Sequence, residues 1–300
     1  MSVLIEQQGQ TMNFTSEPWV ILSDIERSIK AKIEKYGTPL RDWDIHIYRG
    51  ILTGCNEAFI IDEAKKEELI KKDPKSAEII RPILRGRDIQ RNGYEFANLY
   101  LICTFPSKHY DINDFPAIKD WLINGDWVLP NSPIGTGQLR LEQTGQEHTV
   151  NGKKFKSRKK TNNKWFETQD SISYWDDFNK PKIIYQELSQ GSRFAFDPDG
   201  VFFVSNTAYL LTGENLDYLL KVLNSKIIEF VFRNYYSTSM GETGLRWLNQ
   251  YVINLPIPKP TPKSTSVIQN ASESEIEQIL KEAYCLSDSE MQFISDSVNP

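Results

Sequence analysis

The sequence is poor in the residues that build metal sites and nucleophiles. Its 300 residues include only three cysteines and three histidines. Cys55, Cys103 and Cys285 are far apart and form no CxxC pair, which fits a reducing cytoplasm and argues against structural zinc. The histidines share no spacing with one another or with the cysteines. Metal centres and Cys–His or Ser–His nucleophiles therefore have no support in the sequence.

Long apolar runs and nucleotide-binding motifs are also missing. No stretch reaches the ~18 consecutive apolar residues that a membrane span needs, and the first ten residues, MSVLIEQQGQ, lack the basic head and apolar core of a secretory signal. We therefore expect no membrane partner. No glycine-rich strand-to-helix turn is present for a nucleotide or for S-adenosylmethionine.

The overall composition is that of an ordinary globular protein, with 39% hydrophobic and 25% charged residues and a formal net charge of −5. The length suits two domains, or one domain with an appendage. Mild acidity does not exclude a nucleic-acid partner, because such binding depends on where the cations lie and not on their sum.

One stretch departs from this acidic background. It runs from Lys153 to Trp175 and reads KKFKSRKKTNNKWFETQDSISYW. Its first twelve residues contain no acid and seven cations: Lys153, Lys154, Lys156, Arg158, Lys159, Lys160 and Lys164. Cations neutralise phosphates, and aromatic side chains such as Trp165 can stack on bases, so the stretch is a candidate DNA contact. The alternative is a solvated surface loop.

The pattern of the chain predicts an α+β fold with a mixed, largely antiparallel sheet and flanking helices. We expect an irregular N-terminal segment over residues 1–15, a main domain over 16–262, and a linker with a small helical tail over 263–300. The proline-rich and polar linker composition predicts weak attachment of the tail. Residues 125–152 are rich in loop-forming residues, and we expect them to form one mobile arm with the basic run.

Several elements can be assigned by periodicity and by turn residues. Within the main domain we expect a first helix from Ser16 to Gly37, a hairpin of residues 192–196 with 201–210, and one long amphipathic helix from Gly213 to Tyr235. Apolar residues of the long helix, including Leu219 and Leu223, form one stripe that should be buried against the sheet.

A metal-dependent nuclease would need an acid followed by Glu-x-Lys on adjacent strands. Asp44 with Glu63 and Lys65 matches this pattern loosely. Glu63, however, starts a segment with helical features, and Glu-x-Lys is common by chance in a chain this charged. From its residues alone, the chain has the features of a binding protein.

Five ordered blocks carry a resemblance to a known family: residues 48–62, 78–105, 164–189, 202–213 and 244–260. In order and spacing they resemble the C-terminal target-recognition region of single-chain type IIG restriction–modification enzymes with TaqI-like specificity domains. In that family a nuclease and an adenine methyltransferase precede this region. The methyltransferase's Asn-Pro-Pro-Tyr tetrapeptide and glycine-rich cofactor loop do not occur in this sequence.

The resemblance thus implies an excised recognition fragment or a stand-alone specificity protein without catalytic motifs of its own. Its partners would be double-stranded DNA and the methyltransferase and nuclease domains of the parent enzyme. We expect no cofactor in this chain, since S-adenosylmethionine and Mg²⁺ would belong to the parent enzyme. The alternatives are a complete DNA nuclease or methyltransferase of divergent sequence, or a protein-interaction module.

The recognition role of the family maps onto residues of the matching blocks, whereas the seven cations of the basic run are candidates because of their charge. The block residues are Arg49, Thr53, Asn56, Arg85, Arg87, Lys164, Trp165, Gln169 and Gln186. Arg and Lys pair with guanine, and Asn and Gln with adenine. Trp165 is as compatible with a core position as with a DNA wedge, and its usual burial favours the core.

Overall fold

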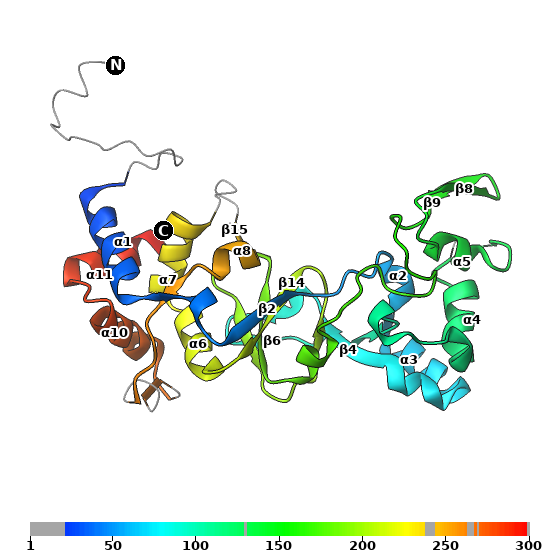
Figure 1. Cartoon of the computed structure of the whole chain (residues 1–300), viewed down its shortest axis with the longest axis horizontal. Coiled ribbons are helices and arrows are strands. Elements are labelled where there is room, and N and C mark those ends of the chain that lie inside the picture. The colour runs from blue at the N-terminus through cyan, green and yellow to red at the C-terminus, as the bar shows by residue number, and fades with distance from the viewer. Residues whose placement is uncertain (1–21, 129–130, 238–243, 263–266, 269, 299–300) are drawn as a thin grey trace, which may run out of the picture.

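The computed structural model describes residues 22–128, 131–237, 244–262, 267–268 and 270–298. The expectations for residues 1–15 and for a helix start at Ser16 lie outside these residues. Two lobes lie side by side along the long axis of the molecule, with a sheet between them (Figure 1). Each lobe has its own cluster of buried apolar side chains.

The sheet between the lobes is antiparallel, with strand order β12-β10-β14-β2. Its strands are β12 (Phe194–Asp197), β10 (Lys182–Gln186), β14 (Ala208–Gly213) and β2 (Ile45–Arg49). Successive side chains point to opposite faces, so Ile183 and Tyr185 of β10 enter one cluster and Ile184 the other. Both faces are buried, which explains why β10 is apolar without alternation.

Helices cover the first face of this sheet and form the helical lobe (left in Figure 1). They are α1 (Asp24–Tyr36), α6 (Leu216–Leu223), α7 (Lys226–Val231), α8 (Asn249–Val252), α10 (Glu273–Ala283) and α11 (Asp288–Val298). A capping box of Ser23 and Glu26 begins α1, and the N–H of Gly37 closes it on the carbonyl of Ile33. The predicted end of the first helix is confirmed.

The tail after the prolines packs into this lobe, so the prediction of weak attachment is wrong. Leu280 and Tyr284 are fully buried, and the Tyr284 hydroxyl donates to the carbonyl of Pro256 at 2.6 Å. The Nζ atom of Lys32 in α1 lies 2.7 Å from Oε2 of Glu290 in α11. The first and last helices therefore lie together, as Figure 1 shows.

The predicted long helix is divided. Helix α6 ends at Leu223, Ser225 caps α7 by accepting the N–H of Ile228, and a π-helical turn (Phe232–Tyr236) continues α7. The side chain of Asn224 instead exchanges hydrogen bonds of 2.8 and 3.1 Å with the backbone of Phe194 at the edge of the sheet. The predicted apolar stripe is buried, with Leu219 and Leu223 fully buried.

The second lobe contains a smaller mixed sheet with strand order β13-β4-β7-β3. Its strands are β13 (Phe203–Val204), β4 (Ile80–Leu84), β7 (Leu99–Ile102) and β3 (Ile60–Asp62). Its helices are α2 (Asn56–Phe59), α3 (Glu63–Lys72), α4 (Pro116–Asn124) and α5 (Thr136–Leu141). Four two-stranded pairs complete the described strands: β1 (Thr38–Pro39) with β16 (Pro256–Ile257), β5 (Ile89–Gln90) with β6 (Gly93–Tyr94), β8 (Glu147–Val150) with β9 (Lys153–Lys156), and β11 (Leu188–Ser189) with β15 (Leu245–Arg246).

The hairpin predicted across residues 197–200 is wrong, although the turn is present. Strand β12 pairs with β10, whereas β13 runs parallel to β4 in the other sheet. The carboxylate of Asp197 is buried and accepts the N–H groups of Val201 and Phe202 as well as Lys182 Nζ. The turn therefore directs the chain from one sheet to the other.

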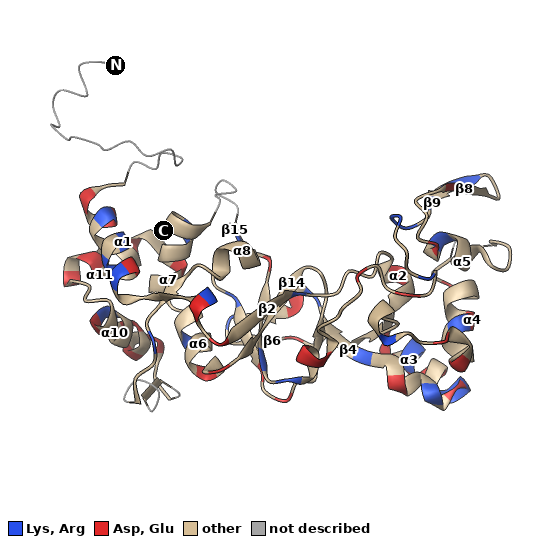
Figure 2. Cartoon of the chain, viewed as in Figure 1, with Lys and Arg blue, Asp and Glu red and all other residues tan. Residues whose placement is uncertain are grey.

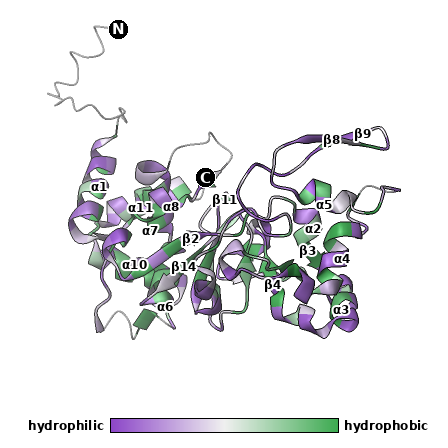
Figure 3. Ribbon diagram, turned by 45° about the vertical axis from the view of Figure 1, so that its right-hand side comes forward, coloured by the Kyte–Doolittle hydropathy of each residue, from purple (hydrophilic) through white to green (hydrophobic). Residues whose placement is uncertain are grey.

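The α+β class with mixed, largely antiparallel sheets is confirmed, since β13–β4 is the one parallel pair among the named strands of the described residues. Hydrophobic segments lie on the central strands and on the helices around them, whereas the hairpin β8–β9 is mostly hydrophilic (Figure 3). Among the described helices, none has the length and apolar character needed to cross a membrane.

Candidate nucleic-acid interface

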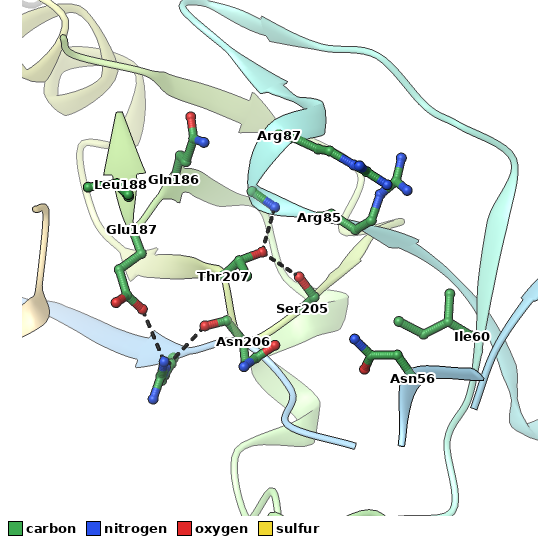
Figure 4. A pocket seen from close by; sticks show the side chains of 12 residues that line it. Asn56, Ile60, Arg85, Arg87, Gln186, Glu187, Leu188, Ser205, Asn206 and Thr207 are labelled. Atoms are coloured by element: carbon green, nitrogen blue, oxygen red, sulfur yellow. Dashed lines mark hydrogen bonds and ion pairs between the residues drawn. The ribbon is translucent and has the colours of Figure 1, made fainter. Parts of the chain in front are cut away.

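An open groove of about 560 Å³ lies at the junction of the two lobes (Figure 4). It begins where β2 ends and α2 starts, and it includes the turn after β4, the end of β10 and the turn between β13 and β14. The lining residues are Arg49, Asn56, Ile60, Arg85, Gly86, Arg87, Gln186, Glu187, Leu188, Ser205, Asn206 and Thr207.

The groove brings together five of the residues that the sequence selected: Arg49, Asn56, Arg85, Arg87 and Gln186. Four of the five sequence blocks supply its lining. The fifth block reaches it through Arg246, whose guanidinium pairs with Glu187. Segments that are up to about 200 residues apart in the chain thus meet at one surface.

Two arginines follow β4 and differ in their environment. Arg85 is held by Asp88 through Nε–Oδ2 and Nη2–Oδ1 hydrogen bonds of 2.9 and 2.7 Å. Partial burial by itself raises the pKa of Asp88, but the hydrogen bonds from Arg85 outweigh it, and the pKa lies below its usual value. Arg87 is exposed, and within the described part of the chain its guanidinium has no ion-pair partner.

The turn after β4 is in close backbone contact with the turn between β13 and β14 on the other wall of the groove. The N–H of Gly86 donates to Oγ1 of Thr207 at 2.9 Å. A Cβ atom at Gly86 would lie 2.5 Å from the carbonyl oxygen of Thr207, which is closer than real Cβ atoms approach. Glycine is required here because the two walls of the groove are packed backbone against backbone.

On the opposite side, Thr53 and Asn56 have different roles. Thr53 is 1% exposed, so the prediction that it contacts DNA is corrected: its hydroxyl accepts the N–H of Cys55 and donates to Oδ1 of Asn56 at 2.7 Å. This bond fixes the amide of the exposed Asn56, whose Nδ2 has no hydrogen-bond partner among the described residues. Gly54, with φ +78°, makes the turn between them.

The two glutamines lie in different places. Gln186 lines the groove, and its Oε1 atom is buried without a hydrogen-bond partner among the described residues. A buried unpaired acceptor is costly, which makes this amide a candidate for a partner outside the protein. Gln169 is half-buried against Gly54 and lies outside the groove lining.

The basic run begins in a hairpin that it shares with the end of residues 125–152, and the mobility expected of this arm stays a prediction. The first residues of the run form strand β9, which pairs with β8 in a hairpin that extends to the upper right in Figure 1. Six lysines on and after β9 are exposed: Lys153, Lys154, Lys156, Lys159, Lys160 and Lys164. Figure 2 shows basic residues on this hairpin. None of the six forms an ion pair within the described ranges.

Arg158 is the exception within the run, and its predicted DNA contact is corrected. It is 5% exposed, and its Nε, Nη1 and Nη2 atoms donate to the carbonyls of Leu141, Thr53 and Trp165 at 2.9, 2.8 and 2.6 Å. Burial lowers the pKa of Arg158 to about 10, so the guanidinium stays charged at neutral pH. It anchors the hairpin beside α5 and the turn that carries Asn56.

Trp165 is partly buried against the second core cluster, edge to face with Phe166 at a centroid distance of 5.6 Å. This position agrees with the preference for a core role. The nuclease alternative requires Glu63 and Lys65 on a strand, but Glu63 begins helix α3, as the sequence indicated. Lys65 pairs with Glu68 on the same helix. No cluster of acidic, His or Cys side chains suited to a metal occurs among the described residues.

Sequence reasoning missed Glu187, Arg246 and the turn Ser205–Thr207. All of them lie inside the blocks that carry the family resemblance, but no local pattern distinguishes them from ordinary charged and polar residues. Their pairing depends on β11 lying against β15 and on β13 lying against β4. These contacts join parts of the chain that the sequence does not place together.

Comparisons with known proteins identify the family and the fold of the chain. A family model described as the TaqI-like C-terminal specificity domain matches residues 81–257. The chain is 27% identical over 298 residues to the type II methyltransferase M.BstVI of Geobacillus stearothermophilus, which covers 94% of this chain and 47% of that protein. It is 21% identical over 271 residues to the type II methyltransferase M.PaeR7I of Pseudomonas aeruginosa, with 87% and 41% covered. The chain thus spans about half the length of these curated relatives.

Two solved structures share the fold. One is the type IIL restriction–modification enzyme MmeI in complex with DNA, with a TM-score of 0.54 and 13% identity over 87% of this chain and 36% of that chain. The other is the type IIG restriction endonuclease BpuSI, with a TM-score of 0.50 and 13% identity over 92% of this chain and 32% of that chain.

Proposed function

Because the chain belongs to the family of TaqI-like C-terminal specificity domains, we propose that it binds duplex DNA at a specific sequence and thereby positions a restriction–modification enzyme on its site. Its relatives are named as type II methyltransferases and the structural neighbours as restriction enzymes. The methyltransferase and nuclease that it would direct are those of the parent enzyme, which acts on DNA in the cytoplasm.

The groove carries this proposal. All five sequence blocks contribute to it, and its polar side chains offer both kinds of base contact: guanidinium groups for guanine, and the amides of Asn56 and Gln186 for adenine. Contacts to base edges specify sequence, so a groove of this composition suits the base-contacting part of an interface.

The exposed lysines of the hairpin supply the second part. Ammonium groups without ion-pair partners in the described chain can turn toward phosphates, which position a protein on DNA without reading its sequence. Lys153, Lys154 and Lys156 follow one another along β9, and Lys159, Lys160 and Lys164 continue the run. We assign the DNA contacts to residues 16–262, within a fold that helices α10 and α11 complete. Catalysis, S-adenosylmethionine and Mg²⁺ belong to other parts of the parent enzyme in this proposal.

The test is a binding measurement with the full chain. We expect salt-dependent binding to duplex DNA, with one sequence selected from a random pool. With Mg²⁺ the chain should leave mixed-sequence DNA uncut, and with labelled S-adenosylmethionine it should neither bind the cofactor nor methylate. Cleavage or transfer would favour a complete enzyme instead. Absence of salt-dependent DNA affinity would favour a protein-interaction module.

A further inference from the structure

One carboxylate in the lining of the groove, that of Glu187, is shared by two arginines. Oε2 of Glu187 lies 3.1 Å from Nη2 of Arg49, and Oε1 lies 3.1 Å from Nη2 and 3.3 Å from Nε of Arg246. The two arginines come from β2 and β15, nearly 200 residues apart. In Figure 4 a dashed line leaves the labelled Glu187 carboxylate and marks one of these contacts.

The backbone holds Glu187 firmly in this place. Its N–H donates to the carbonyl of Thr207 at 3.0 Å, and its carbonyl accepts the N–H of Trp247 at 2.8 Å. The side chain of Glu187 is only 12% exposed, whereas those of Arg49 and Arg246 are 51% and 46% exposed. The carboxylate is therefore more buried than the two guanidinium groups that it holds; Arg49 lines the groove, and Arg246 reaches it through Glu187.

Stability does not explain this arrangement well. Exposed ion pairs contribute at most about 1 kcal/mol. Orientation explains it better, because an arginine side chain loses much rotamer freedom when it is fixed, and a carboxylate that fixes it in advance removes that cost from binding.

The remaining donors of each arginine define the ligand. Arg49 uses Nε on the carbonyl of Asn206 and Nη2 on Glu187, and Arg246 uses Nε and Nη2 on Glu187. The Nη1 groups of both have no partner among the described residues. Guanine presents two acceptors, O6 and N7, on its major-groove edge, whereas cytosine presents an amino donor there.

We infer that Glu187 is a positioning residue that orients Arg49 and Arg246 to contact guanine, so that the recognised sequence contains G·C pairs whose selection depends on this carboxylate. This inference rests on the proposed function. It assigns no direct DNA contact to Glu187, which acts through the two arginines.

The experiment is selection of the full chain on a pool of duplexes with ten random base pairs, followed by affinity measurements on selected and scrambled duplexes. Glu187→Gln should lower discrimination at one or more G·C positions by roughly 5- to 150-fold, the range of a good bidentate base contact. Affinity for scrambled duplexes should stay equal or rise, because an anion has been removed near the phosphates. A merely structural role would lower both affinities together.

Arg49→Lys and Arg246→Lys provide a second route if Glu187→Gln folds poorly, since each keeps the charge but removes the guanidinium fork. They should lose selection at the same positions. The matched control is Glu68→Gln on α3, because Glu68 is likewise shared by two cations, with Lys65 and Lys72 at 2.6 and 2.7 Å, away from the groove. It should leave the selected sequence unchanged.

The outcomes separate this inference from the proposed function. If the wild-type chain selects a sequence and the Glu187 and arginine variants retain every position of it, the inference is wrong while the proposed function stands. If the wild-type chain selects no sequence, the proposed function fails and the inference fails with it. If the three variants lose selection at G·C positions and the Glu68 control selects the wild-type sequence, both the inference and the proposed function are supported.

Discussion

Three arginines in or beside the groove, Arg49, Arg85 and Arg246, are each paired with a carboxylate, whereas the lysines on and after β9 have no ion pair within the described residues. Both regions are basic, but they differ in freedom. A guanidinium fixed by a carboxylate presents its remaining donors in a defined direction, and an unpaired ammonium on a flexible stem can meet a phosphate in many geometries. In the function proposed above, base contact belongs to the first region and phosphate contact to the second.

Arg158 shows that charge alone does not assign a residue to either region. It lies between lysines in the sequence, yet its guanidinium is buried and bound by three carbonyls. The residue next to it, Lys159, is exposed. One position in the chain thus separates a structural cation from a candidate DNA contact.

The largest effect is expected from removing the C-terminal helices, because the fold that holds both regions should then be lost. A chain truncated after Pro262 loses Ile276, Leu280, Tyr284 and Ile294 from the core. Each such side chain contributes about 1.5–3 kcal/mol, so the loss is comparable to the whole stability of a domain. Denaturant titration should show an unfolded or strongly destabilised chain, with both kinds of DNA binding lost. A control chain without residues 299 and 300 should behave normally, and a truncated chain that folds and binds would contradict the packing described above.

The next effect separates the regions. Changing Lys153, Lys154, Lys156, Lys159 and Lys160 together to Ala should weaken binding to all duplexes alike, by roughly 10³-fold near 0.1 M salt. The slope of log affinity against log salt should flatten by about three to four units, since each phosphate contact contributes about 0.9. The selected sequence should not change. The control is a variant in which Lys66, Lys71 and Lys72 of α3 are changed to Ala. An unchanged salt slope in the hairpin variant would show that the basic run is a solvated surface without phosphate contacts.

A third change tests the boundary between the regions. Arg158→Met should lower the free energy of unfolding by about 2–4 kcal/mol, because three carbonyls lose their donor. Lys159→Met removes the same charge one residue later and should change stability by less than about 0.5 kcal/mol. Thermal or chemical denaturation of the two variants measures the difference. Equal effects on stability would show that Arg158 is not the anchor of the hairpin.

The smallest effect is expected from single changes of the polar residues of the groove, which test whether they contact bases. Asn56→Ala or Gln186→Ala should cost about 1–3 kcal/mol of affinity for the selected duplex and leave scrambled duplexes unaffected. Thr53→Val keeps the shape but removes the hydrogen bond to Asn56, and it should cost about 1 kcal/mol on the selected duplex alone. Competition binding with both duplexes checks this. A uniform loss on both would place these residues outside base contact.

Much of the fold was predictable because it depends on local pattern. The end of α1 at Gly37, the apolar strand β10 and the buried stripe through Leu219 and Leu223 follow from short-range signals. The continuous helix and the hairpin were wrong because Asn224 and Asp197 bind partners from other segments. A side chain that bonds to a distant backbone overrides the preference of its own neighbourhood.

The sequence by itself determined the class of fold, the family and where the cations are concentrated, because composition and order are local properties of the chain. Only the tertiary structure decided which cations face outward. Nothing in the sequence distinguishes Arg158 from the exposed lysines beside it. It is buried because the carbonyls of Thr53, Leu141 and Trp165 surround its guanidinium. Glu187 acquires two arginines only when β2 and β15 meet it. Desolvation and hydrogen bonding depend on neighbours in space, and those neighbours come from segments that the sequence leaves unpaired.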